Sequence, residues 1–346
     1  MRKRVLITGA KGFIAGYLID YLLCRGYSVI GIDDYSKYGY IKKSYDDDID
    51  FEFHEMDVRK SYWHHLLHGC DHLIAIAAQV GGISYFNAYA YDLLRNNELI
   101  IASTFDAALK VFGKRNEPLK KITVISSSMV FENATEFPTP EGHQLQCPPP
   151  SSTYGFQKLA TEYFAYGALR QYGLPYTIIR PFNCIGLGEY KALGSKKIKS
   201  GNIELAMSHV VPDLVKKIVS KQRPLHIFGN GDQIRHYTYG GDIARGIAMS
   251  LDNEKTINDD FNISTQEQTT VKQLANFISY KIDRDYFPNG DQYFIYDEPF
   301  PYDVQKRIPY TGKAKKILGF EATVPLYEAL DEIIPWIKSM MDEGKI

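Results

Sequence analysis

Short apolar segments alternate with stretches of helical periodicity through the first half of the sequence. Residues 4–8 (RVLIT) form an apolar run that ends at Gly9, and the next apolar residues recur at helical spacing up to Gly26. Further strands are predicted at residues 28–32, 51–53, 73–76, 122–125 and 176–180. Parallel neighbours require long crossover connections, and these crossovers are right-handed. The alternation therefore predicts an α/β fold with a doubly wound parallel sheet.

The regular alternation ends near the middle of the chain. Residues 184–240 are rich in glycine, lysine and proline, with only one clear amphipathic helix at residues 211–219. Residues 286–310 contain prolines among aromatic residues, and both stretches are typical of loops around a cleft. The chain is also longer than the roughly 250 to 300 residues at which single cores stop growing. We therefore expect a large domain at residues 1–183 and a smaller, discontinuous domain mainly at residues 184–346. A strand near residues 260–264 would return to the large sheet.

Charge and cysteine content limit the classes of partner and compartment. The 40 Lys and Arg residues are matched by 41 Asp and Glu residues, so no single-signed field would attract a nucleic acid or an anionic membrane. No run approaches the roughly 18 apolar residues of a membrane span. The 4 cysteines lie far apart without a C-x-x-C pair, which is typical of a reducing compartment. We expect a soluble, cytoplasmic protein with neither nucleic acid nor membrane as a partner.

A glycine-rich turn joins the first predicted strand to the first predicted helix. Its residues 9–15 (GAKGFIA) place backbone N–H groups and the positive end of a helix where they can hold a pyrophosphate. Asp33 ends the second strand, where a carboxylate accepts bonds from an adenosine ribose and repels a ribose phosphate. This order favours NAD over NADP, although Lys37 close behind would attract a phosphate. The alternative is that Gly9 and Gly12 serve only a tight turn and that Asp33 caps a loop.

Tyr154 and Lys158 lie one helical turn apart, on the same face of a predicted helix. A free tyrosine has a pKa near 10, and a neighbouring ammonium lowers it by favouring the phenolate. A phenolate can take a proton from a sugar hydroxyl while the hydride of the same carbon leaves for a nicotinamide. Residues 126–128 (SSS) end the buried strand at residues 122–125, where open α/β sheets place their ligands. The alternatives are a surface pair for Tyr154 and Lys158 and an ordinary turn for the serines.

Segments spread over nearly the whole chain match one protein family in the expected order. They are TGAKGFI (8–14), IDD (32–34), MDVR (56–59), AAQVGG (77–82), SSSMVF (126–131), YGFQK (154–158), RPFN (180–183), GNGDQIR (229–235) and RIPY (307–310). The chain resembles an extended short-chain dehydrogenase/reductase, more narrowly the NAD-dependent nucleotide-sugar epimerase/dehydratase group. The resemblance implies a Rossmann fold, NAD as the cofactor and a nucleotide-diphosphate sugar as the substrate.

The resemblance also implies roles for individual residues. Tyr154 would be the catalytic base, Lys158 would also hold the nicotinamide ribose, and Ser127 would be the hydroxyl partner. The cofactor would contact Gly9, Gly12, Phe13, Ile14, Asp33, Asp57, Val58, Ala77, Ala78, Asn97, Tyr154 and Lys158. The sugar nucleotide would contact Ser128, Asn183, Val211, Arg235 and Arg307, with the two guanidinium groups on its phosphates. The alternative for the arginines is a pair of ordinary surface ion pairs.

Met129 departs from the family pattern. Sugar 4,6-dehydratases and decarboxylating relatives have an acid at this position, and a thioether cannot carry a proton. A 3,5-epimerase would have a cysteine there, together with a lysine in the loop after Asn183. Met129 therefore favours an epimerase, acting most simply at carbon 4 through a transient keto-sugar. The alternatives are an NDP-4-keto-sugar reductase, a 3,5-epimerase or dehydratase of the same family, and a non-catalytic dinucleotide-binding scaffold.

A histidine cluster and a lysine cluster each have two interpretations. His64 and His68, which accompany His65 and His72, share a helix face as metal ligands can, but no clear third ligand accompanies them. We expect a solvent-facing helix there and no metal. The lysines of residues 191–199 would form a lid over an anionic sugar nucleotide, or simply a solvated loop.

Two predicted helices carry extra apolar and aromatic residues. They lie near residues 94–111 and 153–172, and the residues are Leu99, Ile100, Phe105, Tyr163, Tyr166 and Leu169. The family uses this surface for the seam of a homodimer. A purely internal core would explain the same residues.

Overall fold

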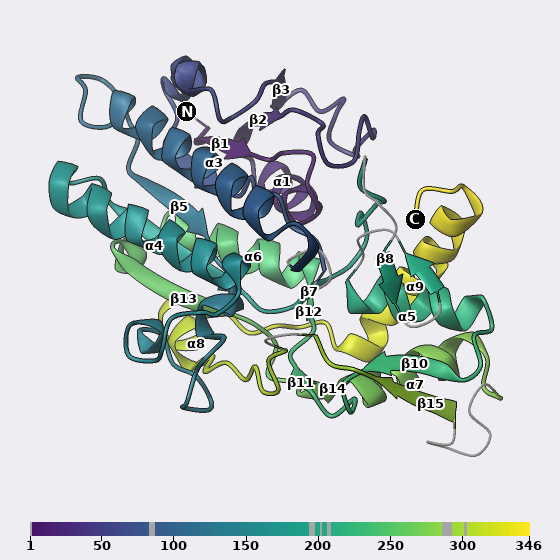
Figure 1. The fold of residues 1–346 in the computed structure, drawn as a ribbon. Coiled ribbons are helices and arrows are strands. Elements are labelled where there is room, and N and C mark those ends of the chain that lie inside the picture. The colour runs from purple at the N-terminus through teal and green to yellow at the C-terminus, as the bar shows by residue number, and fades with distance from the viewer. Residues whose placement is uncertain are drawn as a thin grey trace.

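The computed structural model describes residues 2–82, 87–193, 198–200, 203–205, 209–285, 293–300 and 303–346. Its main element is a seven-stranded sheet with parallel pairing throughout, in the order β13-β6-β5-β4-β1-β2-β3 (Figure 1). The strands are β1 (Arg4–Thr8), β2 (Ser28–Asp33), β3 (Phe51–Glu55), β4 (His72–Ala75), β5 (Lys121–Ile125), β6 (Tyr176–Pro181) and β13 (Asp259–Ile263). The α/β fold with a doubly wound parallel sheet is confirmed.

Helices cover both faces of this sheet. They are α1 (Phe13–Cys24), α3 (Ala90–Val111), α4 (Thr153–Tyr172), α6 (Gly240–Leu251) and α8 (Gly312–Leu318). Leu6 of β1 packs into the apolar core beneath α3 and α4, which lie side by side. Its neighbours Val5 and Ile7 pack into the core beneath α1, α6 and α8, because successive strand side chains point to opposite faces. Burial on both faces explains why the strands are continuous apolar runs rather than alternating ones.

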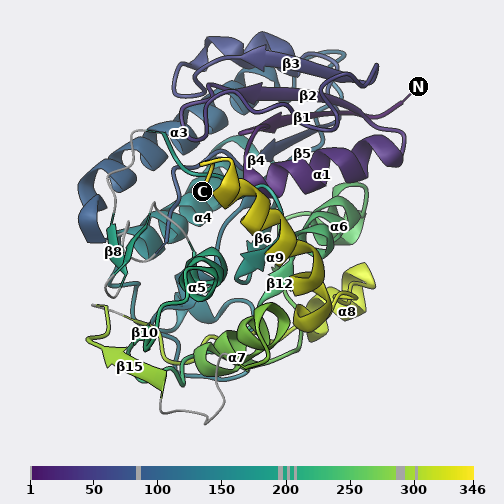
Figure 2. The same cartoon turned by 90° about the vertical axis from the view of Figure 1, so that its right-hand side faces the viewer.

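A smaller unit has an apolar core of its own. It contains α5 (Val210–Val219), α7 (Val271–Ile282), α9 (Leu326–Asp342) and the parallel pair of β10 (Leu225–Phe228) and β15 (Phe294–Asp297). Figure 2 shows α7, β10 and β15 at the end of the molecule remote from β3. Short pairs join β7 (Cys184–Ile185) to β12 (Thr238–Tyr239), β11 (Ile234–Arg235) to β14 (Thr269–Thr270), and β8 (Ile198–Ser200) to β9 (Ile203–Leu205). None of the described helices is both long and apolar enough to cross a membrane.

The chain returns to the large sheet after entering the smaller unit. The strand expected near residues 260–264 is β13, which pairs in parallel with β6 at the edge of the sheet. The helix expected at residues 211–219 is confirmed as α5. The loops expected in the rest of residues 184–240 and in residues 286–310 include strands such as β10 and β15, so the expectation is wrong for those strands. Residues 286–292 and 301–302 of this stretch lie outside the described residues. The division of the chain at residue 183 stays a prediction.

A buried ionic network connects α4 to the two strands at this edge of the sheet. Arg180 of β6 donates from Nε and Nη2 to the two carboxylate oxygens of Glu162, at 2.7 Å each, and pairs through Nη1 with Asp260 at 2.6 Å. Ser126 donates to the same Glu162 carboxylate, and Lys313 of α8 pairs with Asp260. Burial alone would lower the pKa of Arg180, but the two carboxylates outweigh it and raise that pKa. The network therefore holds the helix that carries Tyr154 and Lys158.

The histidine cluster differs from the expectation. Residues 61–67 form a 3-10 helix, η1 (Ser61–Leu67), so His64 and His68 do not share an α-helical face. His68 Nδ1 contacts a carboxylate oxygen of Glu117, and His72, buried on β4, contacts Asp252 at 3.1 Å. In the part of the chain that the structure describes, no three His, Cys, Asp or Glu residues gather in a way that would hold a metal.

Candidate active site

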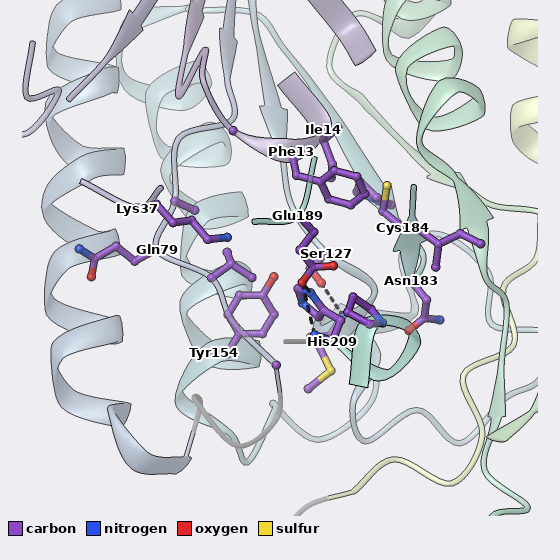
Figure 3. Close-up of a pocket in the computed structure, with 18 of the residues that line it drawn as sticks. Phe13, Ile14, Lys37, Gln79, Ser127, Tyr154, Asn183, Cys184, Glu189 and His209 are labelled. Atoms are coloured by element: carbon purple, nitrogen blue, oxygen red, sulfur yellow. Dashed lines mark hydrogen bonds and ion pairs between the residues drawn. The ribbon is translucent and has the colours of Figure 1, made fainter. Parts of the chain in front are cut away.

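A cavity of about 490 Å³ lies where the carboxyl ends of the sheet strands meet the smaller unit (Figure 3). Its wall combines the turn after β1, the end of β2, the segments after β4 and β5, and α4 with the start of α5. The lining includes the following residues proposed from the sequence: Gly9, Gly12, Phe13, Ile14, Asp33, Asp57, Val58, Ala77, Ala78, Ser127, Ser128, Tyr154, Lys158, Asn183, Val211, Arg235 and Arg307.

The glycine turn fits a pyrophosphate. Gly9 has φ +73° and its N–H donates to the Ile32 carbonyl, so the turn folds back against β2. A Cβ on Gly9 would lie 2.8 Å from Cα of Ala77, which leaves no room for a side chain. Helix α1 begins at Phe13 after Gly12, and no side chain caps its first turn. Uncapped N–H groups at a helix N-terminus on the cavity wall are what a pyrophosphate requires.

We expect Gly9→Ala to weaken NAD binding at least about tenfold, since the added methyl group moves the Ala77 segment into the pyrophosphate site. The positive φ adds a loss of stability of about 1 to 3 kcal/mol. Gly26→Ala is the matched control, because Gly26 has φ +79° but nothing within 4 Å of its Cβ position. It should lose stability and keep NAD affinity, measured by calorimetric titration and thermal unfolding. Equal affinities for NAD in the two variants would contradict the close approach at Gly9.

Asp33 ends β2 and lines the cavity, where the sequence predicts a contact with the adenosine ribose. Its carboxylate accepts hydrogen bonds from the backbone N–H groups of Lys11 at 3.0 Å and Tyr35 at 2.8 Å. Burial raises the pKa of Asp33, and the two backbone bonds oppose that rise. The residues present therefore fit a dinucleotide, with the glycine turn on the pyrophosphate and Asp33 on the ribose.

Asn97 and Asp57 have partners that the sequence did not predict. Asn97 is outside the cavity lining, and its side chain amide holds the main chain of Gln79, accepting from its N–H at 2.7 Å and donating to its carbonyl at 3.0 Å. Asn97 therefore fixes the main chain of Gln79, which lines the cavity, while Asn97 itself does not line it. Its predicted contact with the cofactor stays a prediction. Asp57 lines the cavity but also accepts from the Arg59 guanidinium at 2.8 Å, a contact that lowers its pKa.

The proposed catalytic residues meet at the end of β5. Helix α4 begins just before Tyr154, and its N-cap is Ser152, whose hydroxyl accepts from the Gly155 N–H at 3.0 Å. The phenol of Tyr154 is buried, and the nearby Ser127 hydroxyl opposes the rise in its pKa that burial causes. The ammonium of Lys158 donates to the Ile125 carbonyl at 3.1 Å and lies 6.0 Å from the centroid of the Tyr154 ring.

The charges around the phenol differ from the simple pair that the sequence suggested. Burial raises the pKa of Tyr154, and the groups that oppose this rise are the Ser127 hydroxyl, Arg307 and Lys37. Burial also lowers the pKa of Lys158 to about 8. Lys158 is not among the groups that oppose the rise, and its ammonium donates to a backbone carbonyl rather than to the phenol, so the prediction that Lys158 lowers the pKa of Tyr154 stays a prediction. Figure 3 shows the Lys37 ammonium pointing toward the Tyr154 hydroxyl.

Arg235 and Arg307 form a positive region in the part of the cavity beyond Tyr154. Arg307 donates to the Asn183 side chain at 3.1 Å, and its other nitrogen lies 2.8 Å from Sδ of Met129. Burial and the nearby Arg235 lower the pKa of Arg307 to about 9. Arg235 pairs with Asp303 at 3.0 Å, in a contact whose side chains are only 12% and 10% exposed. The alternative that both arginines form ordinary ion pairs on the surface is therefore wrong, because both line the cavity.

Glu189 and His209 are cavity residues that the sequence analysis missed. Glu189 is buried and accepts from both the backbone N–H and the ring Nδ1 of His209 at the start of α5. Burial works against the charge of Glu189, but His209 outweighs it and lowers the pKa of this carboxyl. No motif joins the two residues, so no sequence signal indicated the pair. Of the lysine loop, residues 194–197 lie outside the described residues, and Lys191 is exposed.

Comparison with known proteins agrees with this geometry. A model of the NAD dependent epimerase/dehydratase family matches residues 5–264. A putative UDP-glucose 4-epimerase of Methanocaldococcus jannaschii is 27% identical over 341 residues, covering 97% of this chain and 98% of that protein. A solved UDP-glucose 4-epimerase of Thermotoga maritima with UDP-glucose has 26% identity, a TM-score of 0.76 and coverage of 98% and 99%. A UDP-glucuronic acid 4-epimerase of Bacillus cereus, solved with UDP-glucuronic acid and NAD, has 23% identity, a TM-score of 0.77 and coverage of 97% and 99%. The chain therefore belongs to the NAD-dependent epimerase/dehydratase family.

Proposed function

We propose that the chain is an NAD-dependent epimerase of a nucleotide-diphosphate hexose, which inverts carbon 4 through a transient keto-sugar. The observation that supports this most is the single cavity that contains Tyr154, Ser127 and Lys158 together with Arg235 and Arg307. Arg307 lies close enough to Tyr154 to lower the pKa of the phenol. A diphosphate held by the two guanidinium groups would therefore place its sugar beside the phenol.

The chain's own groups would handle the proton of the sugar hydroxyl. NAD, when bound, supplies the site that accepts a hydride from carbon 4 and returns it. Tyr154 takes the hydroxyl proton as that hydride leaves and gives it back when the hydride returns to the opposite face of the sugar. Ser127 holds the same substrate oxygen, and Lys37 and Arg307 favour the phenolate against the effect of burial.

Met129 supports epimerisation rather than dehydration. Elimination of water from carbons 5 and 6 needs an acid and a base beyond Tyr154, and a thioether supplies neither. Its Sδ lies 2.8 Å from the Arg307 guanidinium, where it forms part of the wall. Glu189 is another carboxylate of the cavity, and it is paired with His209.

We also propose a homodimer that uses the outer faces of α3 and α4. Leu99 is 43% exposed and Tyr163 is 57% exposed, so both offer apolar surface to a second copy. Phe105, which the sequence suggested for the same surface, is buried in the core, and Ile100, Tyr166 and Leu169 pack partly against that core. The mass in solution, measured by light scattering, tests the proposal, and a monomer at every concentration would exclude it.

Proton NMR of sugar nucleotides in deuterated water tests the proposed reaction. The purified protein is incubated with UDP-, GDP-, dTDP- and CDP-hexoses without added cofactor. We expect one pair of 4-epimers to interconvert without deuterium at carbon, because the hydride returns from retained NAD. Deuterium at carbon 3 or 5 would indicate enolisation and would contradict the proposal. A requirement for stoichiometric NADH or NADPH would indicate a reductase instead.

A further inference from the structure

Lys11 lies inside the glycine turn, between Gly9 and Gly12, and contributes to the cavity wall. Its backbone N–H donates at 3.0 Å to Asp33, the carboxylate expected at the adenosine ribose. A phosphate on the 2′ oxygen of that ribose would therefore come within reach of the Lys11 side chain. An ammonium in this place would attract the phosphate and counteract its repulsion by Asp33.

The side chain of Lys11 is held in a closed aromatic box instead. It is 5% exposed, and its ammonium forms an ion pair with Asp46. The ammonium also lies near four rings, at centroid distances of 6.0 Å for Tyr35, 5.5 Å for Tyr45, 5.5 Å for Phe51 and 4.4 Å for Phe53. The Lys11 ammonium therefore already interacts with a carboxylate and with several aromatic rings.

Asp46 is itself fixed against the glycine turn. Its second carboxylate oxygen accepts from the Lys43 N–H at 2.9 Å. The neighbouring Tyr45 is buried, and its hydroxyl donates to the Ala10 carbonyl at 2.6 Å. The segment at residues 43–46 is thus fastened to the same turn that carries Lys11, and Asp46 cannot move away without breaking these bonds.

The other lysines of this region have different surroundings. Lys37, which the sequence suggested as a phosphate partner, has its ammonium beside Tyr38, Glu189 and Tyr154. Lys43 places its ammonium 5.4 Å from the centroid of the Tyr190 ring. Burial lowers the pKa of Lys43 to about 8, and the charges of Lys11, Asp46 and Asp33 also act on it. Lys11 therefore combines two features. Its backbone N–H binds Asp33, the carboxylate expected at the ribose, while its ammonium pairs with Asp46 instead.

We propose that Asp46 is a cofactor-specificity residue, which keeps the Lys11 ammonium away from the ribose 2′ position and so helps the site to reject NADP. Asp46 acts by positioning Lys11 and does not touch the cofactor. Asp33 repels the 2′-phosphate directly, and Asp46 removes the cation that would offset this repulsion. The rejection of NADP thus rests on two carboxylates, of which the sequence pattern indicates only the first.

Binding of NAD⁺ and NADP⁺ to protein stripped of bound nucleotide tests the proposal, by calorimetric titration without any sugar. We expect Asp46→Asn to lower the Kd for NADP⁺ by about tenfold or more and to change the Kd for NAD⁺ by less than about threefold. The matched control is Asp47→Asn, one residue away, where the carboxylate is 79% exposed and pairs with Lys42. This control removes the same charge and should leave both Kd values within about twofold.

Lys11→Met decides whether the ammonium is the cause. In the double variant with Asp46→Asn it should abolish the gain in NADP⁺ affinity, and alone it should leave NADP⁺ binding as weak as in the unaltered protein. An unchanged ratio of the two Kd values in Asp46→Asn, or a gain that persists in the double variant, would overturn the proposal. Asp46→Ser keeps an acceptor for the Lys43 N–H and carries the same expectation if Asp46→Asn fails to show a cooperative thermal transition. Because only binding is measured, failure of the proposed epimerisation would not affect the result.

Discussion

Tyr154→Phe is expected to lower kcat by at least about a hundredfold, the usual scale of acid–base catalysis, with little change in NAD binding. The variant lacks only the hydroxyl that exchanges the proton with the sugar. The ring keeps its packing against Leu93, Met129 and Val304, so the fold should persist. Steady-state kinetics on the sugar nucleotide identified by NMR and calorimetric titration of NAD measure the two quantities.

The control for this prediction is Tyr172→Phe at the end of the same helix. Tyr172 is 56% exposed and is not part of the proposed dimer surface, so loss of its hydroxyl should leave kcat within about twofold. Substantial turnover by Tyr154→Phe would contradict the proposal that the Tyr154 hydroxyl exchanges the proton with the sugar. Loss of NAD affinity together with turnover would instead indicate that Tyr154 shapes the cavity.

Glu162→Gln is expected to lower the free energy of unfolding by about 3 to 5 kcal/mol. The substitution keeps the volume of the side chain but leaves the guanidinium of Arg180, which is 0% exposed, with Asp260 as its remaining carboxylate. It also replaces one of the two acceptor oxygens, which receive hydrogen bonds from Arg180, Ser126 and Gln144, with an NH₂ group that can only donate. Unfolding in urea, followed by circular dichroism, measures the loss.

Glu52→Gln is the matched control for the buried pair. Glu52 contacts Arg4 at 2.7 Å, but its side chain is 50% exposed, so water screens the interaction. The expected loss is about 1 kcal/mol or less. If both variants lost a similar amount of unfolding free energy, burial of the Glu162–Arg180 pair would add nothing to the stability that the pair provides.

The main sheet was predictable because its central strands are buried on both faces. Strands β5 and β6 lie inside the molecule, and their apolar runs are recognisable without knowledge of any partner. Strand β15 was not predicted, since it pairs with one neighbour only and exposes Ile295 and Tyr296 by 41% and 45%. Its sequence, FIYD, is a short apolar run, and the prolines at positions 288, 299 and 301 on either side of it suggested a loop.

The candidate site was predictable where topology alone determines position. Asp33 is the last residue of β2 and the serines at residues 126–128 follow β5, and parallel strands bring their carboxyl ends to one edge of the sheet. Contacts between side chains from distant segments were not predictable in the same way. Lys37 meets Tyr154 only because the segment after β2 folds over the cavity, and Glu189 meets His209 only through the smaller unit.

The late arrival of β13 affects the order in which the molecule can assemble. Strand β6 ends at Pro181, but its outer neighbour begins only at Asp259, after α5 and β10 of the smaller unit have been synthesised. Until then β6 is an open edge that can pair with another nascent chain. It also carries Arg180 without Asp260 as a counterion. An amino-terminal fragment that stops at residue 183 should therefore aggregate rather than bind dinucleotide on its own.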